Sequence, residues 1–213
     1  MCGIVGIYSS QAKDRTPEIL NKMKDAIRHR GPDDEGSYFD GPIALGHRRL
    51  SIIDLSTGKQ PISNQDQTLT TVFNGEIYNF QSIREQLKEY SFQTHTDTEV
   101  LVHFYDQKKE KMLADLNGMF AFAIWDKKQN ELFIARDRLG IKPLYYYFKD
   151  GLFIFASEIK ALLKHPAVSR DLSFQAISQY FAFDYVPAPL TIYENIFKLP
   201  AGHFIKIKKI KCK

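Results

Sequence analysis

Cysteine is scarce in this sequence: Cys2 and Cys212 are the only two among 213 residues, and they stand at opposite ends. A disulfide framework needs more cysteines, so we expect a fold without disulfides and a cytoplasmic location. No apolar run is long enough to span a membrane, and no basic stretch precedes the short apolar segment Gly3–Tyr8. Neither a membrane anchor nor a signal peptide is therefore predicted.

Metal-binding and nucleic-acid-binding patterns are missing as well. The six histidines are scattered, and no His-x-x-x-His or Cys-x-x-Cys pair occurs. The formal net charge is +4, but lysine and arginine form no block before the C-terminal tail. Without a basic stripe or a reader motif, a nucleic-acid partner is not expected. We also expect no metal site and no membrane partner.

Hydrophobic residues make up 44% of the chain, which is enough for the core of one large domain or two small ones. Strand-like and helix-like runs are grouped in blocks instead of alternating, which predicts an α+β fold. The four strand-like runs between residues 119 and 156 predict an antiparallel meander. Strands are expected at residues 3–8, 36–39, 43–48, 69–74, 119–125, 131–135, 144–148, 152–156 and 204–208, and helices at 17–29, 80–90, 98–106, 112–116, 157–164 and 173–181.

Local signals predict where several of these elements begin and end. Thr16 followed by Pro17 predicts the start of a helix, because threonine caps helix N-termini and proline fits the first turn. Asn79 is expected to cap the helix at 80–90 in the same way. Asn74-Gly75 is a common hairpin-turn pair, so it predicts the end of the strand at 69–74.

Cys2 stands directly before a predicted buried strand, where its position at the chain end permits unusual chemistry. Once Met1 is removed, the residue carries a free α-amine beside its thiol, with unperturbed pKa values of about 8 and about 8.5. The amine can act as the general base for the thiol, directly or through a water, so no catalytic histidine is required. The alternative is a small buried hydrophobic residue without chemistry.

Seven motifs bear on this choice, and they occur in one order: MCGIVGIY (1–8), RHRGPD (28–33), RLSI (49–52), NGEIYN (74–79), TDTE (96–99), RDRLGIKPLY (136–145) and ASEIKAL (156–162). Over essentially the whole chain they resemble the class II, N-terminal-nucleophile glutamine amidotransferase domain of asparagine synthetase. Within that class they are more similar to asparagine synthetase than to amidophosphoribosyltransferase or glucosamine-6-phosphate synthase.

The resemblance implies a four-layer αββα sandwich, the N-terminal-nucleophile hydrolase fold, with two mostly antiparallel sheets between helical layers. It also implies an enzyme that hydrolyses L-glutamine to L-glutamate and ammonia. Cys2 matches the family's nucleophile, which forms a thioester, and its α-amine would move the protons. Asn74 and Gly75 match the oxyanion hole, whose donors stabilise the developing negative charge. Taken alone, however, Asn74-Gly75 is typical of a plain turn.

A pocket for free glutamine needs a cation for the α-carboxylate and anions for the α-ammonium. Arg49 matches the family's carboxylate-binding arginine, although charge alone does not distinguish it from Arg48. Asp97 and Glu76 match the ammonium-binding acids, and Asp97 also suits the start of a helix. The backbone after Arg49 is expected to line the same pocket, through Leu50, Ser51, Ile52 and Ile53.

The remaining motif residues are interpreted as support. Residues 30–32 match a family loop near the pocket mouth, which we interpret as a support or a lid. Residues 136–145 are interpreted as a strand end, a turn and an aromatic strand. His29, His47 and His95 lie near motifs, but the chemistry requires none of them, so structural roles are expected.

The resemblance assigns residues 2–205 to the glutaminase domain and leaves 206–213 as a basic tail or the start of a linker. Asparagine synthetases continue into an ATP-pyrophosphatase domain with a Ser-Gly-Gly-x-Asp-Ser loop, and this chain has no adjacent glycine pair. We therefore expect ATP and Mg only in such a synthetase part and no cofactor in this domain. The expected partners are L-glutamine and a C-terminal synthetase domain or partner chain, and a homodimer is left open.

The implied purpose of the ammonia is ATP-dependent synthesis of asparagine from aspartate. Three alternatives stay open: a non-catalytic docking or regulatory module, the amidotransferase half of an enzyme that amidates another carboxylate, and a hydrolase of another amide. Retention of Met1 would also prevent catalysis, because the nitrogen of Cys2 would then be an amide and not a base.

Overall fold

Two antiparallel sheets lie at the centre of the computed structural model, which describes residues 1–51 and 58–208. The six-stranded sheet has the order β10 (Ile196–Lys198), β8 (Tyr145–Lys149), β9 (Leu152–Ala156), β1 (Gly3–Tyr8), β3 (Ile43–Arg49) and β2 (Asp34–Asp40). The five-stranded sheet has the order β11 (Phe204–Lys208), β7 (Glu131–Arg136), β6 (Gly118–Asp126), β5 (Leu69–Ile77) and β4 (Ile62–Ser63).

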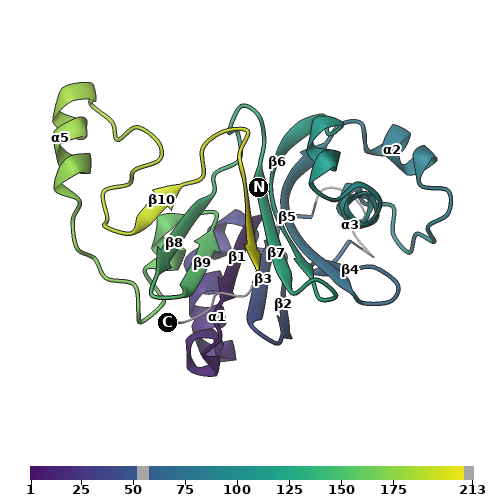
Figure 1. Cartoon of the computed structure of the whole chain (residues 1–213), viewed down its shortest axis with the longest axis horizontal. Helices are drawn as coiled ribbons and strands as arrows, with labels where there is room; N and C mark the ends of the chain where they lie inside the picture. Colours follow the sequence, from purple (N-terminus) through teal and green to yellow (C-terminus); the bar gives the residue numbers. More distant parts are fainter. Residues whose placement is uncertain (52–57, 209–213) are drawn as a thin grey trace.

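Helices cover the outer face of each sheet, so the molecule has four layers (Figure 1). Helices α1 (Pro17–Ala26) and α4 (Ile159–Leu162) pack on the six-stranded sheet, and α2 (Phe80–Gln86) and α3 (Asp97–Lys108) pack on the five-stranded sheet. One buried hydrophobic cluster lies between the sheets, and one lies under each helical layer. The predicted αββα sandwich is confirmed. Short 3₁₀ helices lie at Ala12–Arg15, Arg28–Arg30 and Lys109–Ala114.

Strand β1 is buried on both faces because its alternating side chains enter two different clusters. Ile4 and Tyr8 point between the sheets, whereas Val5 and Ile7 point towards α1. Gly6 lies against the ring of Phe155, where an added Cβ would come within 2.2 Å of a ring carbon. With β3 on one side and β9 on the other, the strand fixes the N-terminal end of the chain in the middle of a sheet.

The four strands between residues 118 and 156 form two hairpins in different sheets. β6 pairs with β7 in the five-stranded sheet, and β8 pairs with β9 in the six-stranded sheet. The single meander predicted from the sequence is therefore wrong. Each hairpin is encoded by its local pattern, but the choice of sheet depends on partners far away in the chain, such as β5 for β6 and β1 for β9.

Two predicted helix starts turn out differently. Thr16 caps α1 as predicted, because its Oγ1 accepts a hydrogen bond from Ile19 N at 3.3 Å. Asn79 precedes α2 but makes no capping bond. Its amide instead donates to Asp115 O at 2.9 Å and accepts from Asn117 N at 3.0 Å, so a tertiary contact takes the side chain away from its own helix.

Strand β5 runs through Asn74-Gly75 to Ile77 and does not turn there. Its partner β6 pairs with it along the whole length, with Gly75 opposite Phe120. An added Cβ on Gly75 would lie 2.2 Å from the carbonyl oxygen of Met119, so the sheet itself requires glycine at this position. Pairing with a long partner strand has overridden the local turn signal.

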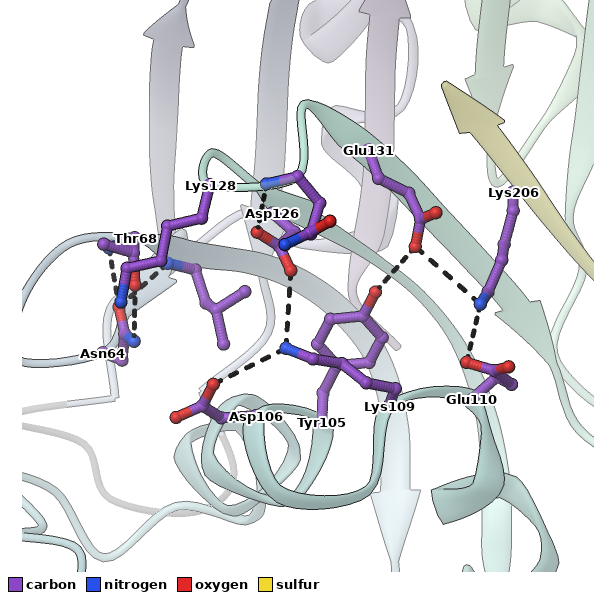
Figure 2. A network of polar contacts seen from close by, with 12 residues as sticks. Asn64, Thr68, Tyr105, Asp106, Lys109, Glu110, Asp126, Lys128, Glu131 and Lys206 are labelled. Carbon is purple, nitrogen blue, oxygen red and sulfur yellow. Dashed lines mark hydrogen bonds and ion pairs between the residues drawn. The ribbon is translucent and has the colours of Figure 1, made fainter.

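Polar contacts join α3 and the 3₁₀ helix after it to the five-stranded sheet, including its edge strand β11 (Figure 2). The buried Tyr105 hydroxyl donates to Glu131 Oε1 at 3.0 Å. Lys206 Nζ lies 2.6 Å from Glu110 Oε2 and 3.9 Å from Glu131 Oε1. Lys206 belongs to β11, which pairs with β7 up to Lys208. The sheet thus continues past the predicted domain end at residue 205, whereas residues 209–213 lie outside the described part.

Helix α5 (Phe174–Phe183) projects from the sandwich (Figure 1) and carries a run of exposed aromatic side chains. Phe174 is 84% exposed and Phe181 is 81% exposed. Ser173 caps the helix by accepting a hydrogen bond from Ala176 N at 3.3 Å. Within residues 1–51 and 58–208, no helix is long and apolar enough to cross a membrane.

The anchoring of β1 by Ser157 can be tested by substitution. The wholly buried Ser157 Oγ accepts the Ile4 N–H at 3.0 Å, while Ser157 N donates to Ile4 O at 2.9 Å. Ser157→Ala leaves a buried N–H without its acceptor, so we expect a loss of about 1–3 kcal/mol in the free energy of unfolding, measured by urea titration. Ser82→Ala, at an exposed position of α2, is the control, and an equal effect of both variants on the free energy of unfolding would contradict this account.

Candidate active site

One cavity of about 250 Å³ opens where the ends of both sheets meet the first turn of α3. Its walls come from the chain start, the end of β3, the middle of β5, the start of α3 and the loop after β7. Seven predicted site residues line it: Cys2, Arg49, Leu50, Asn74, Gly75, Glu76 and Asp97. Residues far apart in the sequence are thus brought to one place.

Cys2 directly precedes β1 and lies against the end of β3. Its Sγ accepts a hydrogen bond from Leu50 N at 3.4 Å and lies 3.6 Å from Leu50 O, to which the thiol can donate. The Cys2 carbonyl accepts from Arg30 Nε at 2.9 Å, and Arg30 is held by Glu158 at 3.0 Å. The predicted supporting role of residues 30–32 thus has a concrete contact, because Arg30 fixes the backbone of Cys2.

Burial determines the resting state of the thiol. It raises the pKa of Cys2 above its usual value, and this outweighs the lowering effect of the Leu50 hydrogen bond and of the nearby charges on Arg49 and Lys142. The thiol is therefore protonated at neutral pH and needs a base. With Met1 attached, the nitrogen of Cys2 is an amide, so the base appears only when Met1 is removed.

Asn74 presents an unsatisfied amide in the cavity wall. The residue is 1% exposed, and neither amide atom has a hydrogen-bond partner among the described residues. A buried polar side chain without a partner is rare and costs stability. Because Asn74 lines the cavity, its amide is free to donate to a bound ligand, as an oxyanion hole requires.

The two neighbouring arginines of β3 point in opposite directions. Arg48 pairs with Asp25 and with Glu35 Oε2 at 2.8 Å on the outer side of the sheet, beside α1. Arg49 is 5% exposed and lines the cavity. The alternation of side chains along a strand explains the difference: Arg49 faces the cavity, whereas Arg48 faces α1.

Acidic groups line the same cavity as this cation. Asp97 is the first residue of α3, where Thr96 is the cap, and its Oδ2 accepts a hydrogen bond from Ile77 N at 3.0 Å. Burial raises the pKa of Asp97 to about 6, and the charge of Glu76 acts in the same direction. A cationic ligand group would relieve both effects, so the pair suits an ammonium.

The segment after Arg49 is only partly as predicted. Leu50 lines the cavity, but Ser51 does not, because its N–H donates to Asp33 Oδ2 at 2.8 Å. Ile52 and Ile53 lie outside the described residues.

Several residues of the cavity wall were not predicted from the sequence, and Lys142 and Gln60 have the most polar side chains among them. Lys142 is 4% exposed, burial lowers its pKa, and its Nζ donates to the Met1 Sδ at 3.2 Å. Asp137 holds this loop by accepting hydrogen bonds from the backbone of Ile141 and Lys142. The motif at 136–145 pointed to this loop, but nothing in the sequence singled out Gln60.

The cavity therefore combines a thiol at the chain end, an unpartnered amide donor, and separated positive and negative groups. Such a set can bind a zwitterion and stabilise an oxyanion next to a sulfur nucleophile. Among residues 1–51 and 58–208, no group of three or more His, Cys, Asp or Glu side chains could hold a metal ion.

An αββα sandwich with a terminal nucleophile in a cavity between its sheets defines the N-terminal-nucleophile hydrolase fold. A solved structure, glutamine phosphoribosylpyrophosphate amidotransferase from Bacillus subtilis, is similar, with a TM-score of 0.63 and 25% identity over 76% of this chain and 43% of that chain. The sequence profile described as "Glutamine amidotransferase domain" matches residues 1–213. The chain belongs to this glutamine amidotransferase family.

Curated relatives are similar over nearly the whole chain. Asparagine synthetase [glutamine-hydrolyzing] 2 of Bacillus subtilis is 41% identical over 97% of this chain, and asparagine synthetase [glutamine-hydrolyzing] 1 of the same organism is 42% identical over 98%. Asparagine synthetase B [glutamine-hydrolyzing] of Escherichia coli is 43% identical over 76%. The chain spans only 29–34% of the length of these three proteins.

Two carboxylates on the first turn of α3 should respond to pH in opposite ways. The folded pKa of Asp97 is about 6 against 3.8 in a model peptide, so ionising it in the folded state costs stability above pH 6. Asp97→Asn should raise the free energy of unfolding by roughly 2–3 kcal/mol at pH 8. The gain should vanish by about pH 3, below both pKa values, where the group is protonated in both states.

Glu99 serves as the matched comparison. Burial raises its pKa, but interactions with His103, Gln93 and Thr94 outweigh this and lower it to about 2. Its stabilising effect is complete above the unfolded pKa of 4.5 and is lost as the pH falls towards 2. Glu99→Gln should therefore destabilise the protein at pH 8. Urea titrations at pH 8 that gave the same sign for the two variants would refute this assignment.

Proposed function

We propose that this chain hydrolyses L-glutamine to L-glutamate and ammonia, with Cys2 as the nucleophile once Met1 is removed. The observation that carries the proposal is the buried, unpartnered amide of Asn74 in the wall of the cavity that holds the Cys2 thiol. Membership of the glutamine amidotransferase family supports it, as do the relatives described as glutamine-hydrolyzing. The reaction requires no cofactor in this domain.

The steps follow from the groups in the cavity. The free amine of Cys2 takes the thiol proton, and the sulfur attacks the side-chain amide carbon of glutamine. The carbonyl oxygen becomes an oxyanion, which accepts hydrogen bonds from the Asn74 amide and the Gly75 N–H. The ammonium of Cys2 returns the proton to the leaving nitrogen, so ammonia departs and a thioester remains. Water, deprotonated by the same amine, then releases glutamate and restores the thiol.

Substrate orientation follows from the charges. Arg49 binds the α-carboxylate through its planar guanidinium, while Asp97 and Glu76 bind the α-ammonium. Side chains of both charges in one cavity favour a free amino acid over an acyl amide, which lacks one or both of the α-carboxylate and the α-ammonium. The side-chain amide then extends towards Cys2 and Asn74.

The ammonia passes, in this proposal, to a synthetase part that uses ATP and Mg to make asparagine from aspartate in the cytoplasm. The names of the relatives support asparagine as the product, and their greater length supports a synthetase part in the same polypeptide or in a partner chain.

Loss of the nucleophile gives the most direct test. Cys2→Ala should abolish glutamate release from glutamine, because no other group in the cavity can form the thioester. The assay measures glutamate and ammonia with protein whose N-terminus is verified by mass spectrometry. A variant with an extra residue before Cys2 should be inactive as well, since its nitrogen is acylated. Turnover that persists in the alanine variant would refute the proposed nucleophile.

Substitutions of the two arginines of β3 distinguish an effect on glutamine binding from an effect on folding. Arg49→Ala should raise the KM for glutamine by about 10- to 100-fold with a smaller effect on kcat, because the lost charge-assisted pair holds the carboxylate in both ground and transition states. Arg48→Ala is the control: it breaks the ion pairs to Asp25 and Glu35 but should leave KM unchanged. An unchanged KM in Arg49→Ala would remove this residue from the pocket.

A further inference from the structure

Side chains hold the backbone of Phe73, the residue before Asn74, where a neighbouring strand would otherwise pair with it. β4 pairs with β5 only at Thr70 and Thr71, so its ladder ends before Phe73. The Phe73 N–H instead donates to the side-chain carbonyl of Gln60 at 2.7 Å, and Phe73 O accepts from His47 Nε2 at 3.1 Å. Two side chains thus replace the missing strand partner immediately before the oxyanion-hole residue.

His47 reaches this position from the other sheet. It lies on β3, is 0% exposed, and burial lowers its pKa to about 4, so the ring is neutral at physiological pH. A carbonyl oxygen only accepts hydrogen bonds, and Nε2 must therefore carry the ring proton. Through this bond the sheet that carries Cys2 and Arg49 is tied directly to the strand that carries Asn74.

Gln60 joins the backbone of the same residue to helix α3. While its carbonyl oxygen accepts from Phe73 N, its Nε2 donates to Thr98 Oγ1 at 3.3 Å. Thr98 follows Asp97 in the first turn of α3, and both Gln60 and Thr98 line the cavity. One amide side chain therefore connects the strand of the oxyanion donor to the helix of the ammonium-binding acid.

Asn74 depends on this support, because its own amide has no hydrogen bond among the described residues that would orient it. Its direction is fixed only by packing and by the backbone of β5. Catalytic donors must be held within a few tenths of an ångström of the reacting atom, and a displacement of about 1 Å can cost about 100-fold in rate.

We infer that His47 and Gln60 are positioning residues, which hold the backbone C=O and N–H of Phe73 and so aim the Asn74 amide at the developing oxyanion. The inference rests on the proposed glutamine hydrolysis. Neither side chain touches the reacting atoms. Both act on the transition state, in which the oxyanion exists, more than on bound glutamine.

The test compares His47→Leu, which has no donor, with His47→Gln, whose amide nitrogen can replace Nε2. In the otherwise unchanged full chain with Met1 removed, His47→Leu should lower kcat for glutamate release by about 10- to 100-fold with little change in KM. His47→Gln should recover most of this loss. Equal losses in both variants, or parallel changes of kcat and KM, would overturn the inference.

His165 provides a matched control. It is also a buried histidine whose Nε2 donates to a backbone carbonyl, that of Asp14 at 2.7 Å, but it does not line the cavity. His165→Leu should lower thermal stability and leave kcat of the folded protein unchanged. A kcat loss in this variant as large as in His47→Leu would mean that any buried histidine bond has this effect, and His47 would have no specific positioning role.

Gln60 provides an independent route if His47→Leu does not fold, because Gln60 is only half-buried at the cavity wall. Gln60→Met keeps the length of the side chain and removes both hydrogen bonds. It should lower kcat in the same way, and combining it with His47→Gln should give a non-additive loss because both side chains hold the backbone of one residue. A wild-type kcat in Gln60→Met would contradict the positioning inference.

An aldehyde analogue of glutamine separates positioning from substrate binding. The Cys2 sulfur adds to the aldehyde carbon, the thiol proton ends on the oxygen, and the resulting hemithioacetal oxygen occupies the oxyanion hole. The inhibition constant of this analogue should rise in proportion to the loss of kcat, whereas that of L-glutamate should not change. If the wild-type protein releases no glutamate, the proposed function fails. If the wild-type protein is active and the His47 and Gln60 variants have the same kcat as the wild type, only the positioning inference fails.

Discussion

The structure depends on the burial of its first strand in the middle of a sheet. Chain ends usually fray, because little holds them on the outer side. Here β1 has neighbours on both edges, β3 and β9, and buries side chains on both faces. The Ser157 hydroxyl and the Arg30 guanidinium fix the backbone still closer to the end. Only such an anchored terminus can present a nucleophile that carries its own base at a fixed place.

The site exists because the two sheets meet at this anchored end. The six-stranded sheet supplies Cys2 and Arg49, and the five-stranded sheet supplies Asn74 and Gly75. Asp97 arrives from the helix that covers the second sheet. The cavity is electrostatically costly when empty, since it holds an isolated amide and a carboxylate whose pKa is raised by burial. A zwitterionic substrate with a carbonyl group satisfies all of these groups together.

The family resemblance predicted the layers, and local signals such as Thr16 predicted many of the elements, because such signals act within a short stretch of chain. The failures have a common cause. Asn74-Gly75 and Asn79 carry strong local signals that distant partners override, β6 in one case and the loop at Asp115 in the other. The contacts of Gln60 and Lys142 could not be predicted, since each joins segments that only the folded topology brings together.

The position of β1 also has a consequence for the order of events during synthesis. One neighbour of the strand comes from residues 43–49, but the other comes from residues 152–156. The chain end is therefore left with an open edge until most of the domain has left the ribosome. The six-stranded sheet is thus completed only when its late hairpin, β8 and β9, reaches the first strand of the chain.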